Sequence, residues 1–160
     1  MGFAKTTTLV ALGTMLALPA FHLTARAAGA VDISADNMEI IDAEHKTIFR
    51  GNVVATRVTD TTKSDEMTVT SGDEKQADGS VKNVTKTVDC QGNVNITTKS
   101  AVISGDWCKL DVLRDKLVVG GTVSLTQGAT VIKGKQLDVD LKTNHLQMSG
   151  GRVSGNFVPN

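Results

Sequence analysis

A short stretch decides the fold: Leu117-Val118-Val119-Gly120-Gly121-Thr122-Val123-Ser124-Leu125. Every second residue, beginning with Leu117, is apolar or a glycine, and the residues between them are mostly small or polar. Successive side chains of a strand point to opposite faces, so this period of two predicts a β-strand with one buried face. Gly121 has no side chain to pack and permits a bend or bulge. The stretch therefore predicts one long strand bent at its glycine, or two short strands that meet at a corner.

The same pattern occurs twice earlier in the chain. Residues 47–55 alternate around Gly51 and residues 88–96 alternate around Gly92, with apolar side chains on one parity and mostly polar ones on the other. A fourth copy, residues 146–153, is weaker and its parity slips by one residue, as expected of a terminal repeat. The repeats therefore predict corners at Gly51, Gly92 and Gly121.

A second kind of segment alternates with these repeats. Its four copies align on Met38, Met67, Leu110 and Leu137, each followed two residues later by Ile or Val. Successive anchors are 29, 43 and 27 residues apart, and the long interval contains residues 71–86, which are predicted to form a polar insertion loop. The chain is thus about four units of 27 to 30 residues. One unit cannot bury its apolar face alone, so the units are expected to stack.

The composition agrees with an all-β fold. Val, Thr and Ile account for 46 of 160 residues, and these β-branched types suit a pleated surface better than a helical bundle. The 17 basic and 17 acidic side chains balance, which argues against nucleic-acid binding. We predict a flattened solenoid or β-jellyroll whose two apolar faces close on each other. The expected inward side chains are Ile33, Met38, Ile40, Phe49, Val53, Met67, Val69, Val88, Val94, Ile96, Val102, Leu110, Val112, Leu117, Val119, Val123, Leu125, Val131, Leu137, Val139 and Leu141.

Residues 1–27 have the pattern of a secretory signal peptide. Lys5 precedes an apolar run over residues 9–23, and Ala25-Arg26-Ala27 is an Ala-x-Ala cleavage site, with an alternative cleavage after residue 30. The apolar run is marginal for a membrane-spanning helix. Cleavage after Ala27 removes Lys5 and Arg26 and no acidic residue, which leaves 133 residues with 15 basic and 17 acidic side chains, a charge of −2. We therefore expect an exported protein.

Candidate catalytic and metal-binding residues are few. Beyond residue 27 the histidines are His45 and His145, and both lie in polar turn contexts that suit solvated side chains better than metal ligands. The sequence contains no Gly-x-Ser-x-Gly elbow, His-Glu-x-x-His motif or phosphate-binding loop. Asp111, Asp138 and Asp140 would suit glycoside hydrolysis only if they converged in a cleft, and their parity favours a solvated face. We expect a protein that is not an enzyme and that uses no catalytic residue, metal or cofactor.

Cys90 and Cys108 leave two alternatives open. Both fall on the inward parity of their strands, and an oxidising compartment would permit a disulfide between them. The bridge needs Cα atoms within about 7 Å, which the sequence does not show. The other alternative is a pair of small buried apolar residues.

Several segments, in their order, resemble the LptA/OstA family of lipopolysaccharide-transport proteins. The similar segments are Val31-Asp32-Ile33-Ser34-Ala35-Asp36, Met38, Phe49-Arg50-Gly51-Asn52-Val53, residues 119–125, and Ile132-Lys133-Gly134-Lys135-Gln136-Leu137. The resemblance covers about residues 31–153, and it implies one OstA-like β-jellyroll domain of stacked antiparallel strands over residues 31–155, followed by a tail over residues 156–160. It further implies a periplasmic protein that carries lipopolysaccharide between inner-membrane and outer-membrane transport components.

The aliphatic faces fit such a carrier. Each buried CH₂ contributes about 0.8 kcal/mol, so an acyl chain needs an apolar path through the periplasm. Free strand edges at the two ends of the stack would favour head-to-tail self-association. A rival hypothesis is a structural or adhesive β-solenoid that polymerises without a lipid ligand. The residues expected to line the lipid groove are Val31, Ile33, Met38, Ile40, Phe49, Leu110, Val112, Val123 and Leu125.

Overall fold

The structure, a computed structural model, describes residues 31–157. Ten β-strands and one short 3-10 helix, Asp42–Glu44, follow one another along this part of the chain. The strands are β1 (Asp32–Ser34), β2 (Asn37–Ile41), β3 (Lys46–Arg57), β4 (Asp60–Lys75), β5 (Val81–Thr97), β6 (Val102–Asp111), β7 (Lys116–Gln127), β8 (Thr130–Asp140), β9 (His145–Ser149) and β10 (Ser154–Asn156).

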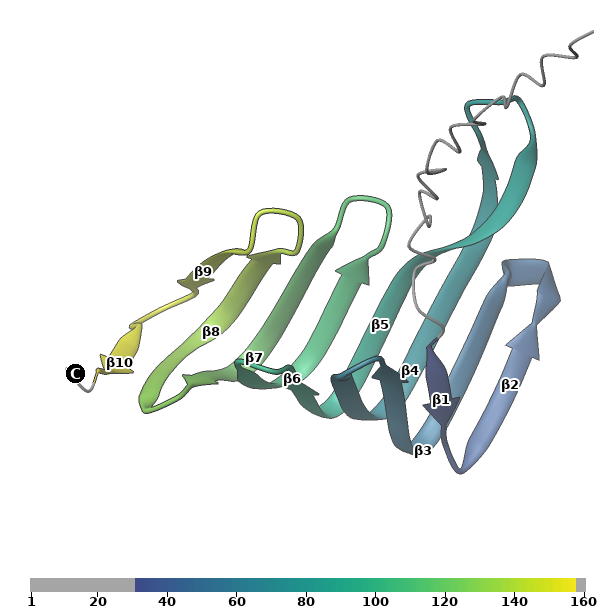
Figure 1. Ribbon diagram of the computed structural model, residues 1–160. Coiled ribbons are helices and arrows are strands. Elements are labelled where there is room, and N and C mark those ends of the chain that lie inside the picture. The colour runs from purple at the N-terminus through teal and green to yellow at the C-terminus, as the bar shows by residue number, and fades with distance from the viewer. Residues whose placement is uncertain (1–30, 158–160) are drawn as a thin grey trace, which may run out of the picture.

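All strands belong to one antiparallel sheet in the order β1-β3-β4-β5-β6-β7-β8-β10. Near its ends the sheet is divided, because β2 also pairs with β3 and β9 also pairs with β8. Neighbours in the sheet are therefore mostly neighbours in sequence, joined by hairpin turns (Figure 1). The predicted all-β stack of antiparallel strands is confirmed.

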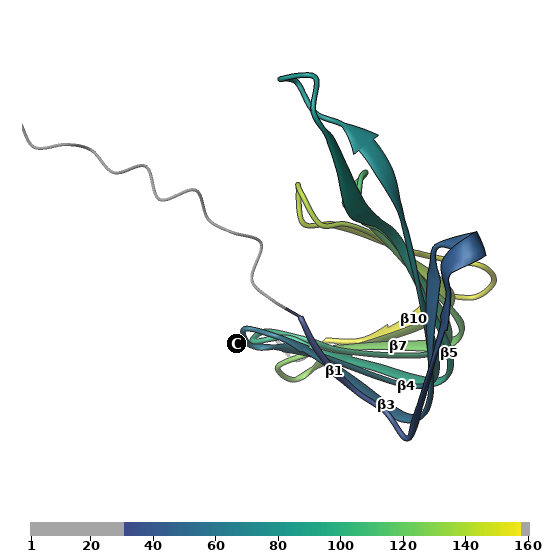
Figure 2. The same ribbon diagram turned by 90° about the vertical axis from the view of Figure 1, so that its right-hand side faces the viewer.

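The long strands bend at a common corner, so that the sheet is V-shaped when viewed from its end (Figure 2). We call its two halves the β2–β9 wall and the β1–β10 wall, after the short strands that each contains. The strand pairing shifts at this corner, between Arg50 and Val53, between Gln91 and Val94, and between Gly120 and Val123. The corners predicted at the central glycines are therefore present.

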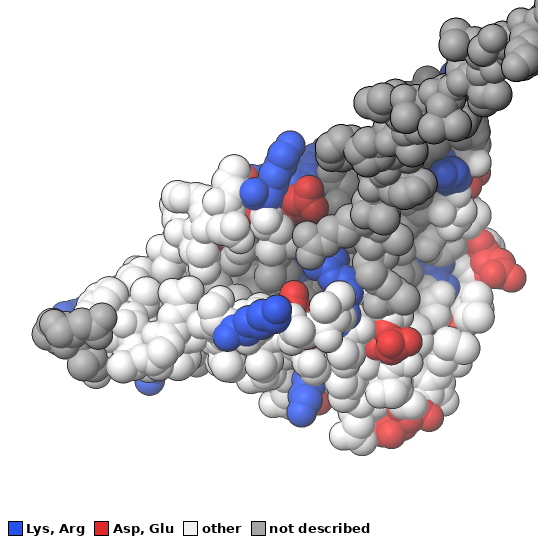
Figure 3. Space-filling view, viewed as in Figure 1, with Lys and Arg blue, Asp and Glu red and all other residues white. Residues whose placement is uncertain are grey.

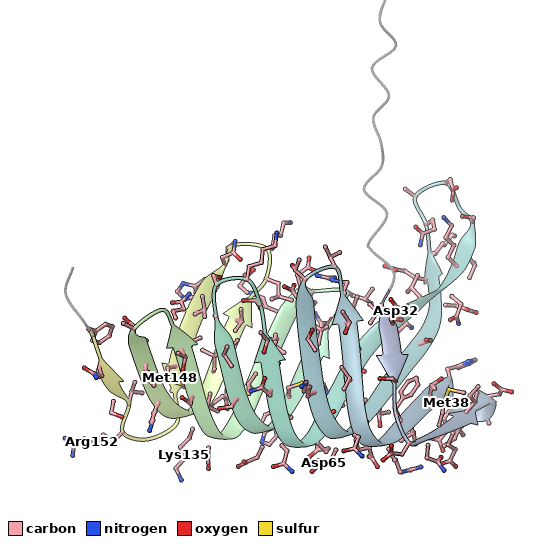
Figure 4. The ribbon with its side chains drawn as sticks, turned by 60° about the horizontal axis from the view of Figure 1, so that its bottom comes forward. Asp32, Met38, Asp65, Lys135, Met148 and Arg152 are labelled. Carbon is pink, nitrogen blue, oxygen red and sulfur yellow. The ribbon has the colours of Figure 1, made fainter. Side chains whose placement is uncertain are left out.

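A carboxylate and a left-handed glycine form each of three corners. Gly92 has φ +75°, a conformation that side chains with a Cβ rarely adopt, and a Cβ there would collide with Asp65 Oδ2. The Asn93 side chain donates a hydrogen bond of 2.7 Å to the same Asp65 oxygen. Asp36 with Gly51 repeats this arrangement, and at Gly121 the backbone N–H of Thr122 donates to Asp106 instead. Asp65 lies on the outside of the bend, as does Lys135, which replaces the aspartate at the fourth corner (Figure 4).

The two strands of a hairpin use different numbers of residues to cross the corner. Phe49 pairs with Met67 and Val53 pairs with Ser64, so the five residues 49–53 of β3 lie opposite the four residues 64–67 of β4. The same bulge recurs between β5 and β6 and between β7 and β8. In a strand that crosses the corner with an odd number of residue steps, the alternation of inward and outward side chains is reversed on the other side of the corner. Val102, expected to point inward, is exposed for this reason, and Ile103 is buried instead.

The polar insertion over residues 71–86 is not a loop, which corrects the sequence prediction. Strand β4 continues to Lys75, and β5 begins at Val81, with register pairs such as Gly72 with Val84 along the extension. This two-stranded arm projects beyond the neighbouring hairpin turns (Figure 1). Strand preference depends on context, and a polar segment can form strands where its backbone groups pair. Composition alone therefore misjudged this segment.

Two predictions concern the ends of the chain. The tail expected from residue 156 begins one residue later, because Asn156 is the last residue of β10. The signal peptide predicted over residues 1–27 lies outside the described residues. Within residues 31–157, no helix is long and apolar enough to cross a membrane.

Candidate functional site

The interior between the two walls is the candidate functional site, and it consists of rows of apolar side chains that run across the strands. In the β2–β9 wall, the row next to the corner connects register partners from Met38 to Met148, which we call the corner row. Its members are Met38, Phe49, Met67, Cys90, Cys108, Val119, Leu137 and Met148. Each member is the direct cross-strand neighbour of the next, so the row is continuous over eight strands.

A second row lies farther from the corner in the same wall, and we call it the far row. Its members are Ile40, Thr47, Val69, Val88, Leu110, Leu117, Val139 and Leu146. The β1–β10 wall contributes the opposite row, with Ile33, Ala55, Thr62, Ile96, Ile103, Leu125, Ile132 and Gly155. Residues of both walls belong to a single hydrophobic cluster.

Seven of the nine predicted lining residues lie on these inward faces. Met38 and Phe49 belong to the corner row, Ile40 and Leu110 to the far row, and Ile33 and Leu125 to the opposite row. Val123 lies beside the corner in the β1–β10 wall, opposite Gly134.

The other two predicted residues lie outside the rows. Val31 precedes β1 and Val112 follows β6, and both are exposed. Sequence reasoning missed Ile103, Ile132 and Met148, and the signal that finds them is cross-strand register rather than parity along one strand.

The interior is filled in the middle of the stack and more exposed toward its ends, most of all at the β2 end. Val123 and Leu125 are buried in the hydrophobic cluster, as are their neighbours Leu117 and Val139. At the β2 end, by contrast, Met38 is 57% exposed and Ile40 is 60% exposed. Met38 lies at the free end of the sheet in Figure 4. The β2 end therefore presents accessible apolar side chains.

A hollow of about 270 Å³ adjoins the same end. Ile40 and Thr47, the first two members of the far row, line it together with His45, Lys46 and Asn83. The backbone of Ser71, at the base of the β4–β5 arm, donates a hydrogen bond of 2.9 Å to the His45 carbonyl oxygen. Apolar and polar groups thus meet where the interior reaches the surface.

Titratable groups are scarce in the interior. Within residues 31–157, no three His, Cys, Asp or Glu side chains cluster in a way that could hold a metal ion. Asp111, Asp138 and Asp140 do not converge, since they bond to Arg114, Gln136 and Lys116 respectively. The exceptions are Cys90 and Cys108, which are free, buried thiols.

The two thiols influence each other. A hydrogen bond from the Cys108 thiol lowers the pKa of Cys90. The same hydrogen bond, together with burial, raises the pKa of Cys108. The sequence left a disulfide and two buried apolar residues as alternatives for this pair, and the structure places both side chains buried and directly opposite each other.

One antiparallel sheet bent into two walls around an apolar interior defines the class of β-jellyroll proteins with stacked hairpins. The family model described as "LptA/(LptD N-terminal domain) LPS transport protein" matches residues 32–145, and the chain belongs to this family. The family resemblance inferred from the sequence is thereby confirmed.

The chain has two further similarities to known proteins. The chain is 31% identical over 135 residues to the uncharacterized protein R00383 of Rhizobium meliloti (strain 1021). The match covers 81% of this chain and 71% of that protein. It is also similar to the crystal structure of LptH from Pseudomonas aeruginosa, the LptA homologous periplasmic component of the lipopolysaccharide transport device, with a TM-score of 0.68 and 15% identity. That match covers 82% of this chain and 96% of LptH, and at this identity it concerns the fold.

Proposed function

We propose that this protein binds lipopolysaccharide through its acyl chains and carries it across the periplasm between inner-membrane and outer-membrane transport components. The observation that carries the proposal is the set of three largely apolar rows, of which the corner row is apolar on all eight of its strands, in a member of a lipopolysaccharide-transport family. Neighbouring strands lie about 4.8 Å apart, so a row of eight strands extends over about 34 Å. Such a row offers an acyl chain uninterrupted apolar contact.

The energetics favour a sheltered path. Each CH₂ group gains about 0.8 kcal/mol when it leaves water, so an acyl chain held in the interior is far more stable than one in the periplasmic solvent. Sugar and phosphate groups remain outside, where water solvates them. This function requires neither bond chemistry nor a cofactor.

Access to the middle of the interior requires the two walls to separate. Met38 and Ile40 are open to a ligand as the structure stands, whereas Leu125 packs within the hydrophobic cluster. We therefore propose that acyl chains enter at the β2 end and displace the packing between the walls as they advance. The apolar side chains of each wall then pack against the acyl chains instead of the opposite wall, which limits the free-energy cost of opening.

Photo-crosslinking tests the path of the lipid. A photoreactive amino acid is placed at Ile40, at Leu125, or at Lys109, which is exposed and directed away from the interior. After irradiation of living cells, lipopolysaccharide adducts are expected at Ile40 and Leu125 and not at Lys109. Equal labelling at Lys109 would contradict an interior path. Labelling at Ile40 without labelling at Leu125 would contradict separation of the walls.

We further propose that copies of the chain associate head to tail. The β1–β2 end carries Asp32 and Asp36, and the C-terminal end carries Arg152 and the exposed apolar residues Val153 and Phe157. On the face shown in Figure 3, acidic side chains lie mainly toward the β1–β3 end, whereas the β8–β10 end is largely uncharged or basic. Free strand backbone with complementary charge at the two ends favours strand addition between copies.

Light scattering tests this association with a matched pair of variants. Ile40→Glu places a charge at the β2 end, whereas Val81→Glu places one at a similarly exposed valine on the β4–β5 arm. The molar mass of the first variant is expected to stay that of a monomer at concentrations where the wild type and Val81→Glu associate. Association of all three proteins to the same extent would contradict an interface at this end.

Depletion of the protein in its bacterium tests transport itself. Newly made lipopolysaccharide is expected to accumulate at the inner membrane. Normal delivery to the cell surface would reject the carrier. Normal delivery combined with assembly into polymers would instead favour the structural β-solenoid.

A further inference from the structure

Two thiols interrupt the apolar interior at the centre of the sheet. Cys90 of β5 and Cys108 of β6 are direct register partners in the corner row. They are 1% and 3% exposed, and their neighbours in the row are Met67 and Val119. The lipid-carrying function proposed above makes no use of a thiol, and apolar side chains without one fill the equivalent places elsewhere in the row.

The placement of the pair satisfies the requirements of a disulfide. Directly opposed residues of an antiparallel pair have Cα atoms about 4.5 to 5.5 Å apart, and disulfides join Cα atoms that are about 4.4 to 6.8 Å apart. Both side chains point to the interior, since both are buried in the same cluster.

A third polar group lies beside the pair. The hydroxyl of Ser64, on the neighbouring strand β4, is buried and has no hydrogen-bond partner among the described residues. Three polar side chains therefore meet in an otherwise apolar corner, where imperfectly paired groups are costly. Oxidation of the two thiols removes two S–H donors from this environment and leaves a bridge that packs as an apolar group.

We propose that Cys90 and Cys108 form a disulfide in the exported protein and thereby join β5 to β6 at the centre of the sheet. The inference rests on the proposed periplasmic location, because disulfides persist in oxidising compartments. Strands β5 and β6 form the connection between the N-terminal units, β1 to β5, and the C-terminal units, β6 to β10. The bridge holds this connection when the walls separate.

The reaction is a thiol–disulfide exchange with a protein disulfide or a small-molecule disulfide as oxidant. A thiolate of the chain attacks one sulfur of the oxidant, which releases the other sulfur as a thiolate and forms a mixed disulfide. The second cysteine then attacks its partner within the chain and displaces the remaining oxidant sulfur. The two cysteine thiols lose two electrons and two protons, and the oxidant becomes two thiols. Because both cysteines are buried in the folded chain, the exchange takes place before β5 and β6 close.

Mass spectrometry after alkylation in denaturant tests the bridge. The full-length chain is expressed in its bacterium, and the periplasmic and cytoplasmic fractions are treated with iodoacetamide with and without reductant. No alkylated cysteine is expected in the periplasmic protein without reductant, and two are expected after reduction. A Cys90→Ser variant serves as the control for labelling, since its remaining Cys108 must be alkylated without reductant.

The outcomes separate the bridge from the location. Two alkylated cysteines in protein recovered from the periplasm would overturn the disulfide. Recovery of the chain from the cytoplasm alone would instead overturn the export that the proposed function requires. Refolding of the reduced full-length chain in a glutathione buffer tests the geometry independently of export, and two free thiols after refolding under oxidising conditions would also overturn the proposal.

Thermal unfolding measures what the bridge contributes. Reduction is expected to lower the Tm of the wild type by about 10 °C, because the bridge closes a loop of intermediate length in the unfolded chain. The Tm of a Cys90→Ala/Cys108→Ala double variant is expected not to respond to reductant. An unchanged wild-type Tm on complete reduction would contradict the stabilising role.

Discussion

Residues of the same type are buried at the centre of the sheet and exposed at its ends. Met67 and Met38 belong to the same corner row, yet Met67 is 2% exposed and Met38 is 57% exposed. The difference is that Met67 has neighbouring strands on both sides, whereas Met38 lies on the terminal strand β2. Burial in a stacked sheet therefore depends on position in the stack, and the same side chain can be core at the centre and binding surface at an end.

The corners differ between the C-terminal end and the rest of the sheet. At the three corners made by Gly51, Gly92 and Gly121, an aspartate side chain occupies the space where a Cβ would lie. At the last corner, Gly150 faces the Cβ of Lys135 instead. The first three corners are thus fixed by a hydrogen-bonded carboxylate, whereas the one at the C-terminal end is fixed mainly by backbone conformation. Four predictions probe this contrast between centre and ends.

The largest effect is expected from truncation of a central side chain. Leu137→Ala removes a fully buried member of the corner row and should lower the free energy of unfolding by about 3 kcal/mol. Ile40→Ala at the exposed end should lower it by less than about 0.5 kcal/mol. Urea unfolding monitored by circular dichroism measures both. Equal losses would show that the end is as well packed as the centre.

The corner glycines provide a second matched pair. Gly92 and Gly150 have nearly the same φ, +75° and +78°, so an alanine suffers similar backbone strain at both. Gly92→Ala also displaces the Asp65 carboxylate and its hydrogen bond with Asn93. We expect losses of about 2 kcal/mol for Gly92→Ala and about 1 kcal/mol for Gly150→Ala. The same urea titration tests them, and a larger loss at Gly150 would contradict the role of the aspartate.

Two hairpin turns, one in each half of the chain, allow a comparison of backbone strain. Val58, between β3 and β4, and Gly128, between β7 and β8, both have φ +56°, although only glycine adopts this conformation without strain. Val58→Gly should raise the free energy of unfolding by about 1 kcal/mol, and Gly128→Val should lower it by a similar amount. Changes of the same sign in both variants would show that contacts at these turns outweigh backbone strain.

The smallest effect is expected at Asp140, near the C-terminal end. A hydrogen bond from Lys116 holds the pKa of Asp140 well below its usual range. Because the pKa is depressed in the folded state, the stabilisation is present above the unfolded-state pKa of about 4 and is lost as the pH falls below it. Asp140→Asn should therefore lower stability slightly at pH 7 and flatten the loss of stability between about pH 4 and pH 2.

The control for this prediction is the partner residue. Lys116→Met removes the hydrogen-bond donor and should flatten the same part of the stability profile. Thermal unfolding at a series of pH values measures all three proteins. An acid profile of Asp140→Asn identical to that of the wild type would show that other carboxylates determine the acid response.

Sequence reasoning placed several side chains on the inward face correctly, and its errors on β6 have one cause. Alternation placed Phe49, Leu110 and Leu125 on the inward face. Parity counted back from Cys108 along β6 nevertheless placed Val102 inward, although that residue is exposed. The bulge opposite this strand reverses its parity at the corner, and the bulge is a property of two paired strands rather than of one.

The sequence by itself determined the local features of this protein. The period of two, the glycines at left-handed corner positions and the family are all encoded in short segments, because backbone conformation and side-chain alternation are local. Only the tertiary structure decided that residues 71–86 pair as an arm, that Cys90 faces Cys108, and that the same row is closed at its centre and open at β2. These features depend on which strands are neighbours and in which register they pair, and neither is encoded in the alternation pattern of a single strand.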